Sequence, residues 1–140
     1  MMENGWHITN VRVRYKDTDR MGVVYYGNYL TYFEIGRSEF MREIGFPYSE
    51  LESRGDSLVV TEAALKYHSN VGYDSLVKVK TAITYLRKVR LRFDYEIVSE
   101  ENRRLVTGHT VHACINSGLK PVRIPTDMIK IIEDKIKRKE

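Results

Sequence analysis

The sequence predicts an α+β fold, with one antiparallel sheet of five strands and a single long helix on one of its faces. Five segments have the composition or the alternation of strands, and a segment with helical spacing follows the first of them. The four later strands are joined by turns too short to hold a crossover helix, which excludes a doubly wound α/β fold. We expect one domain over residues 1–140.

The first strand is expected from Trp6 to Tyr15, because Val11, Val13 and Tyr15 share one face while polar residues occupy the other. A polar stretch with two glycines, Lys16 to Gly27, then leads to the long helix.

The long helix is predicted from the recurrence of large apolar residues every three to four positions. Asn28 is a candidate N-cap, and Gly45 is a candidate C-terminal stop. Gly36 in its middle predicts a close approach to another backbone. A short second helix is expected from Pro47 to Arg54. The apolar positions of the long helix are Tyr29, Phe33, Gly36, Phe40 and Ile44.

Four strands rich in Val, Ile, Thr and Tyr should follow, the last two paired as an antiparallel hairpin. Thr126 is a candidate cap for a C-terminal helix. One helix of about 17 residues, roughly 25 Å long, cannot cover five strands from edge to edge, so self-association is expected. The expected strands are Ser57 to Tyr67, Leu76 to Leu86, Val89 to Ser99 and Leu105 to Asn116.

The composition, with 42 % hydrophobic and 30 % charged residues, is that of a globular protein. No apolar run approaches the roughly 20 residues of a membrane span, and no secretion signal is recognisable, so we expect a cytoplasmic protein. The net charge of +4 is compatible with an anionic partner but does not require one. The basic segment from Lys135 to Lys139 is interpreted as a solvated helix end.

The stretch between the first strand and the long helix carries the residues best suited to chemistry. Asp17 and Asp19 precede a helix start, whose free backbone N–H groups can bind a developing oxyanion. A carboxylate beside them can act as a nucleophile or as a general base. Gly22 and Gly27 allow the backbone to bend and a ligand to approach. The alternative is that both aspartates are turn residues bonded to their own backbone.

This stretch resembles the signature of the 4-hydroxybenzoyl-CoA thioesterase family, and especially of its YbgC-like acyl-CoA thioesterase branch. The resemblance covers roughly Val11 to Pro125, with further matches at Phe33-Glu34-x-x-Arg37, at Tyr73-Asp74 and in the segment from Pro121 to Pro125. The matching signature reads Tyr15-x-Asp17-Thr18-Asp19-x-x-Gly22-Val23-Val24-Tyr25-x-x-Asn28-Tyr29.

The resemblance implies a hotdog fold, in which the sheet wraps the long helix, and hydrolysis of an acyl-CoA to a free acid and coenzyme A without a cofactor. It implies that Asp19 is the catalytic carboxylate and that the backbone N–H of Tyr26 polarises the thioester carbonyl. Many members of the branch carry His where this chain has Tyr26, a departure that concerns the substrate class rather than the activity. The supporting residues of the signature are Asp17, Gly22, Tyr25 and Asn28.

Other polar residues are weaker candidates for substrate binding. His68 ends a predicted strand and lies either near the site or on the surface. Arg87, Lys88, Arg90 and Arg92 cluster at a strand turn, where they either bind the phosphates of coenzyme A, across a subunit interface as in the family, or form a charged strand end that discourages aggregation.

Metal and cysteine chemistry are not expected. His109 and His112 lie three apart in a strand and so point to opposite faces, a poor arrangement for joint metal binding. The single cysteine, Cys114, is expected to be a buried structural residue.

Two other functions compete with thioester hydrolysis. One is a non-catalytic hotdog module that binds acyl-CoA or acyl carrier protein. The other is nucleic-acid binding through the basic strands with Tyr85 and Phe93, which leaves the Asp17–Asp19 stretch unexplained. The resemblance favours a homo-oligomer, a dimer or a tetramer, that acts on acyl-CoA, with no nucleic-acid partner and no membrane span.

Overall fold

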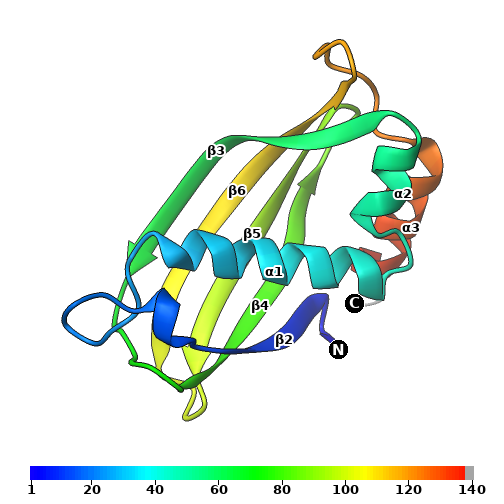
Figure 1. Cartoon of the computed structure of the whole chain (residues 1–140). Coiled ribbons are helices and arrows are strands. Elements are labelled where there is room, and N and C mark those ends of the chain that lie inside the picture. Colours follow the sequence, from blue (N-terminus) through cyan, green and yellow to red (C-terminus); the bar gives the residue numbers. More distant parts are fainter. Residues whose placement is uncertain (138–140) are drawn as a thin grey trace.

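The computed structural model describes residues 1–137 and shows an antiparallel sheet curved around helix α1 (Figure 1). The six strands lie in the order β1-β2-β4-β5-β6-β3. The strands are β1 (Met2–Glu3), β2 (Trp6–Arg12), β3 (Asp56–Tyr67), β4 (Leu76–Leu86), β5 (Arg90–Ser99) and β6 (Arg104–Asn116), and the helices are α1 (Asn28–Glu43), α2 (Tyr48–Ser53) and α3 (Thr126–Lys137).

The α+β class and the antiparallel β5–β6 hairpin are as predicted, but the count of five strands was wrong. The additional strand, β1, is only two residues long and pairs with β2. It is formed because Asn4 and Gly5 both adopt positive φ and turn the chain back on itself. The first predicted strand is also shorter than expected, because Tyr15–Asp17 forms a single 3₁₀ turn.

Helix α1 ends as predicted but starts differently. Gly45 has φ +91°, the left-handed conformation that stops a helix. The N-cap is Gly27, however, and not Asn28. The Asn28 side chain instead donates from Nδ2 to the backbone oxygen of Asp17 at 2.8 Å. Asn28 therefore ties the helix start to the preceding loop rather than capping the helix.

Helix α1 buries its apolar face against the concave side of the sheet. Phe33 stacks on Tyr95 of β5 with a centroid distance of 4.0 Å, and Phe40 meets Phe93 edge to face. Gly36 does allow a close approach, but to side chains of β4 rather than to a backbone as predicted. A Cβ atom on Gly36 would lie 2.5 Å from Thr81 Oγ1 and 2.7 Å from Val79 Cγ1.

Strand β3 forms one edge of the sheet. It pairs with β6 on one side only, and most of its 12 residues are exposed. An edge of this length without a cover is a template for pairing with another strand.

The C-terminal helix α3 buries Met128 and Ile132 in the core, and Arg54 of the segment after α2 donates two hydrogen bonds to the carboxylate of Asp127. The basic segment from Lys135 to Lys139 lies partly outside the described residues. No helix within residues 1–137 has the length and apolar character needed to cross a membrane.

We predict that Gly36→Ala lowers the free energy of unfolding by about 1–3 kcal/mol, because the added methyl group overpacks the contact with β4. The sign opposes helix propensity, which favours Ala over Gly by about 1 kcal/mol. Chemical denaturation measures the change, with Thr31→Ala on the exposed face of the same helix as the control. A Gly36→Ala protein as stable as the wild type would contradict the packing argument.

Candidate active site

The loop between β2 and α1 projects beyond the N-terminal end of the helix (Figure 1). Its base is closed by backbone pairing of Thr18 with Val24. Inside the loop, the backbone N–H of Asp19 donates to Val23 O at 2.9 Å, and the N–H of Gly22 donates to Asp19 O at 3.0 Å. Gly22 has φ +80°, which explains the glycine at this turn. The loop is thus a defined hairpin-like turn.

Asp17 is buried, and one of its carboxylate oxygens is held by two donors. Its Oδ2 accepts a hydrogen bond from the backbone N–H of Arg14 at 3.0 Å and another from the Tyr32 hydroxyl at 2.9 Å. Burial, together with the bond to Asp17, raises the pKa of Tyr32, so this phenol remains a donor at neutral pH. The Asp17 carboxylate is therefore held in the interior, where it shapes the turn.

Asp19 differs from Asp17 in that it is exposed to solvent. Its Oδ1 accepts a hydrogen bond from the backbone N–H of Met21 at 2.9 Å. This is the turn bond that the alternative interpretation predicted, and it orients the carboxylate. Oδ2 has no hydrogen-bond partner among residues 1–137, so one oxygen of an oriented carboxylate is available for chemistry.

The backbone at the start of α1 offers N–H groups that no carbonyl of the helix can satisfy. Within the part of the chain that the structure describes, the N–H groups of Tyr26 and Gly27 donate to no acceptor. The carbonyl oxygen of Tyr26 accepts a bond from the Tyr67 hydroxyl at 3.2 Å, which fixes the peptide from the β3 side. Free donors at a helix N-terminus can bind a developing negative charge.

Asn70 connects three segments around this loop, a role that sequence reasoning missed. Its Nδ2 donates to Val24 O at 3.1 Å, its Oδ1 accepts from the Tyr29 hydroxyl, and its backbone oxygen accepts from Arg103 at 3.1 Å. These contacts span more than 30 residues of sequence, so no local pattern could have indicated them.

Tyr25 and Tyr26 lie beside each other, with ring centroids 4.7 Å apart, and are partly exposed.

His68 follows directly after Tyr67, whose hydroxyl contacts the Tyr26 backbone. Its ring is exposed and bonds to Thr107 Oγ1 at 2.9 Å. The structure thus places His68 beside the site end of β3, with its Nε2 already engaged.

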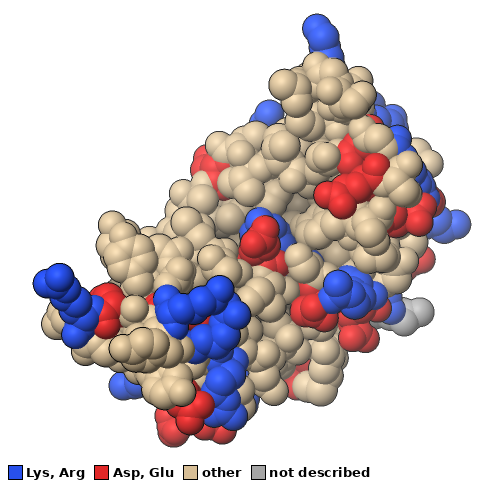
Figure 2. Space-filling model, viewed as in Figure 1, with Lys and Arg blue, Asp and Glu red and all other residues tan. Residues whose placement is uncertain are grey.

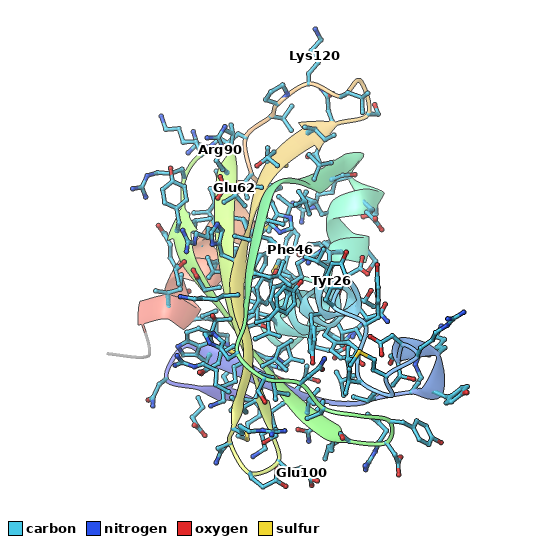
Figure 3. All side chains as sticks on the ribbon, turned by 90° about the vertical axis from the view of Figure 1, so that its left-hand side faces the viewer. Tyr26, Phe46, Glu62, Arg90, Glu100 and Lys120 are labelled. Atoms are coloured by element: carbon cyan, nitrogen blue, oxygen red, sulfur yellow. The ribbon has the colours of Figure 1, made fainter. Side chains whose placement is uncertain are left out.

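Arg87, Lys88 and Arg90 lie far from Asp19 within one chain. They occupy the β4–β5 turn, whereas the loop of Asp19 adjoins the other end of β4, where Val23 pairs with Gly72. The ten residue steps of β4 put roughly 30 Å between the two ends. Figure 3 shows Arg90 at the end of the sheet opposite the Glu100 turn. A single subunit does not bring this basic cluster to the Asp19 loop.

The remaining titratable candidates serve the structure. His109 bonds to Glu62 on β3, while His112 is buried on the other face of β6, so the predicted opposite orientation is confirmed. Cys114 is buried as predicted, and burial raises the pKa of its thiol to about 11. Residues 1–137 contain no cluster of three or more potential metal ligands.

Comparisons with known proteins identify the family of the chain. A profile of the thioesterase-like superfamily matches residues 13–132. The acyl-CoA thioesterase YbgC of Haemophilus influenzae is 33 % identical over 131 residues, which cover 91 % of this chain and 94 % of that protein. The YbgC acyl-CoA thioester hydrolase of Escherichia coli O157:H7 is 31 % identical over 120 residues, 85 % of this chain and 90 % of that protein.

Solved structures show the same fold. A DHNA-CoA thioesterase of Staphylococcus aureus superposes with a TM-score of 0.89 at 33 % identity, over 95 % of this chain and 91 % of the other. The gentisyl-coenzyme A thioesterase BH1999 superposes with a TM-score of 0.82 at 25 % identity, over 89 % and 99 % of the two chains. The expected resemblance is confirmed, and the chain belongs to the thioesterase-like superfamily of hotdog proteins.

Proposed function

We propose that the protein hydrolyses an acyl-CoA thioester to the free acid and coenzyme A. The observation that carries this proposal is that one short segment, residues 19–27, contains both a free carboxylate oxygen, on Asp19, and unpaired N–H groups, at the start of α1. Acyl transfer needs both a base or nucleophile and a donor for the developing oxyanion.

In the proposed reaction, the thioester carbonyl oxygen accepts a hydrogen bond from the Tyr26 N–H. The negative charge that develops on this oxygen is stabilised by the same donor and by the helix dipole. Asp19 either attacks the carbonyl carbon or takes a proton from a water molecule that attacks it. Both routes expel the thiolate of coenzyme A, consume one water molecule and release the free acid.

Asp17 has a supporting role in this proposal. It accepts bonds from Arg14 and Tyr32 through its side chain, and its backbone oxygen accepts from Tyr25 N at 2.9 Å and from Asn28 Nδ2. These bonds hold the loop and the helix start in register, which fixes Asp19 relative to the Tyr26 N–H.

We predict that Asp19→Asn lowers kcat by about 10²–10⁴-fold while the free energy of unfolding stays near the wild-type value, because its exposed carboxylate makes one local bond. Asp17→Asn should instead affect stability more than activity. It should lose roughly 1–3 kcal/mol of stability from an unsatisfied buried group, with a smaller loss of activity.

Free-thiol release from a panel of acyl-CoAs and chemical denaturation measure the two effects. Near-normal turnover by Asp19→Asn would refute the assignment. Tight acyl-CoA binding by the wild type without thiol release would instead identify a non-catalytic module for acyl-CoA or acyl carrier protein.

The proposal includes an oligomer with the site between subunits. The exposed edge of β3 can pair with β3 of a second copy about a two-fold axis. Full-length antiparallel pairing sets Tyr67 of one copy opposite Asp56 of the other. Because Tyr67 contacts the Tyr26 backbone, each helix start then faces the partner subunit.

We predict a stable dimer or tetramer in solution, because a 12-residue open edge beside a partly covered apolar helix favours association. Sedimentation equilibrium at micromolar concentration measures the mass. An active monomer under these conditions would contradict the interface.

Arg87, Lys88 and Arg90 are proposed to bind the coenzyme A phosphates of a site in a neighbouring subunit. The guanidinium of Arg87 lies over the Tyr85 ring at 4.4 Å, which holds it at the surface of the β4–β5 turn. Exposed guanidinium and ammonium groups suit a polyanionic nucleotide.

Neutralising the three side chains together should raise KM for acyl-CoA and leave kcat nearly unchanged, because phosphate contacts are the same in the ground and transition states. Each exposed contact should contribute up to about 1 kcal/mol. An acyl-N-acetylcysteamine thioester, which lacks the nucleotide, is the control substrate. An equal loss with this substrate would disprove the phosphate assignment.

A further inference from the structure

A recess opens on the face of the molecule that carries α1, between α1, α2 and the start of β3 (Figure 2). Its volume is about 180 Å³. Neither the loop of Asp19 nor the basic β4–β5 turn contributes a lining residue to it. The residues that matter for its chemistry are Arg37, Tyr48, Glu34, Glu52, Ser57 and Leu58.

Two hydrogen-bond donors in this recess are poorly paired. The Tyr48 hydroxyl is shielded from solvent, and among residues 1–137 it has no acceptor for its proton, since its polar neighbour is the Arg37 guanidinium, which can only donate. The Arg37 guanidinium forms no ion pair within the same residues, and its one hydrogen bond is a long one of 3.4 Å to the Tyr95 hydroxyl. Buried polar groups in folded proteins are normally paired, so a buried phenol that donates to no acceptor, beside a guanidinium with one long hydrogen bond, indicates a missing acceptor.

The less exposed part of the recess, its floor, carries the positive charge of Arg37. Below Arg37, the Tyr95 hydroxyl bonds to Thr110 Oγ1, which bonds to His112 Nε2. The pKa of His112 is lowered to about 4, mainly by burial and to a lesser extent by the Arg37 charge. The ring is therefore neutral at neutral pH. Burial raises the pKa of Tyr48, and the charge of the Arg37 guanidinium and its contact with the phenol oppose that shift.

The acidic residues of the recess lie at its rim. Glu34 and Glu52 are exposed to solvent, where water and salt screen their charge. Arg37 at the floor therefore attracts an oxygen acceptor, while the two glutamates at the rim disfavour a bulky anion. A small oxygen function at the end of an otherwise apolar group fits both conditions.

The recess faces a partner's active site in the proposed dimer. Ser57 and Leu58 at the start of β3 line the recess, and Tyr67 at the end of β3 contacts Tyr26. Antiparallel pairing of two β3 edges sets the start of one strand opposite the end of the other. The helix start of one subunit and the recess of its partner then lie at the same position along the strands.

We propose that this recess receives the far end of the acyl group whose thioester is held at the partner's Asp19 and Tyr26, and that Arg37 and Tyr48 bind a hydrogen-bond-accepting oxygen there, of a hydroxyl or a carboxylate. The inference rests on the proposed function and adds the class of substrate: acyl groups that carry an oxygen function remote from the thioester. Arg37 and Tyr48 are then specificity-determining residues.

The test compares three series of acyl-CoAs of matched chain length, namely unsubstituted, ω-hydroxy and ω-carboxy thioesters. At the chain length that reaches the recess, kcat/KM of the wild type for at least one oxygenated substrate should exceed that of the unsubstituted one by about 10-fold or more. The preferred series shows whether the oxygen is neutral or charged. Arg37→Met and Tyr48→Phe should each move this ratio towards one.

Two features of the variants separate recognition from structure. Tyr48→Phe removes only a buried hydroxyl that donates to no acceptor, so its thermal stability should not fall. Arg42→Met is the matched control, because Arg42 lies on the same helix, is exposed and pairs with Glu39. This variant should keep the wild-type ratio.

Hydrolysis of unsubstituted acyl-CoAs with no preference at any chain length would overturn this inference and leave the proposed function standing. Equal losses on all three series in both variants would also overturn it, since a purely structural role predicts that result. Absence of hydrolysis with every acyl-CoA would overturn both proposals.

Discussion

Asp17 is the residue on which the geometry of the site depends. Its side chain accepts from the Arg14 backbone and the Tyr32 hydroxyl, and its backbone oxygen accepts from Tyr25 and Asn28. Four bonds to one residue join the end of β2, the 3₁₀ turn and the first turns of α1. Because the carboxylate is buried, leaving any of its donors unsatisfied would carry a desolvation penalty of roughly 1–3 kcal/mol. The loop that carries Asp19 is therefore attached to a rigid base.

The two aspartates share a residue type and differ in environment, which divides their roles. Burial and two side-chain bonds immobilise Asp17, whereas Asp19 is exposed and makes one local bond. A carboxylate with an unpaired, solvent-accessible oxygen can exchange a proton or attack a carbonyl more readily than a buried one that is held by two donors. The tyrosines near the site also fall into a buried and an exposed group. Tyr32 is buried and supports Asp17, while Tyr25 and Tyr26 remain exposed beside the helix start.

Sequence patterns predicted the class of the fold, the long helix and the site loop, because these depend on short-range periodicity and on a contiguous signature. They failed where the outcome depends on contacts between distant segments. Asn28 has the composition of a cap, yet its amide bonds to Asp17 instead. Asn70 and Tyr48 are ordinary in sequence, and only folding brings them to Val24 and Arg37. The separation of Arg87 from Asp19 follows from the length of β4, which the sequence indicated, and from the sheet order, which it did not.

The loop of Asp19 and the recess of Arg37 lie near opposite ends of α1. The length of this helix explains why they would serve two different active sites. Tyr26 and Arg37 are eleven residues apart, which is roughly 16 Å along an α-helix. Between them, α1 is packed on the sheet through Phe33, so a substrate could not follow the helix through the core of one subunit. In the proposed dimer this separation would disappear, because the antiparallel β3 edges would exchange the two ends. An open sheet edge would then couple assembly to substrate choice: the proposed catalytic groups would come from one chain, and the groups that read the acyl end would come from the other.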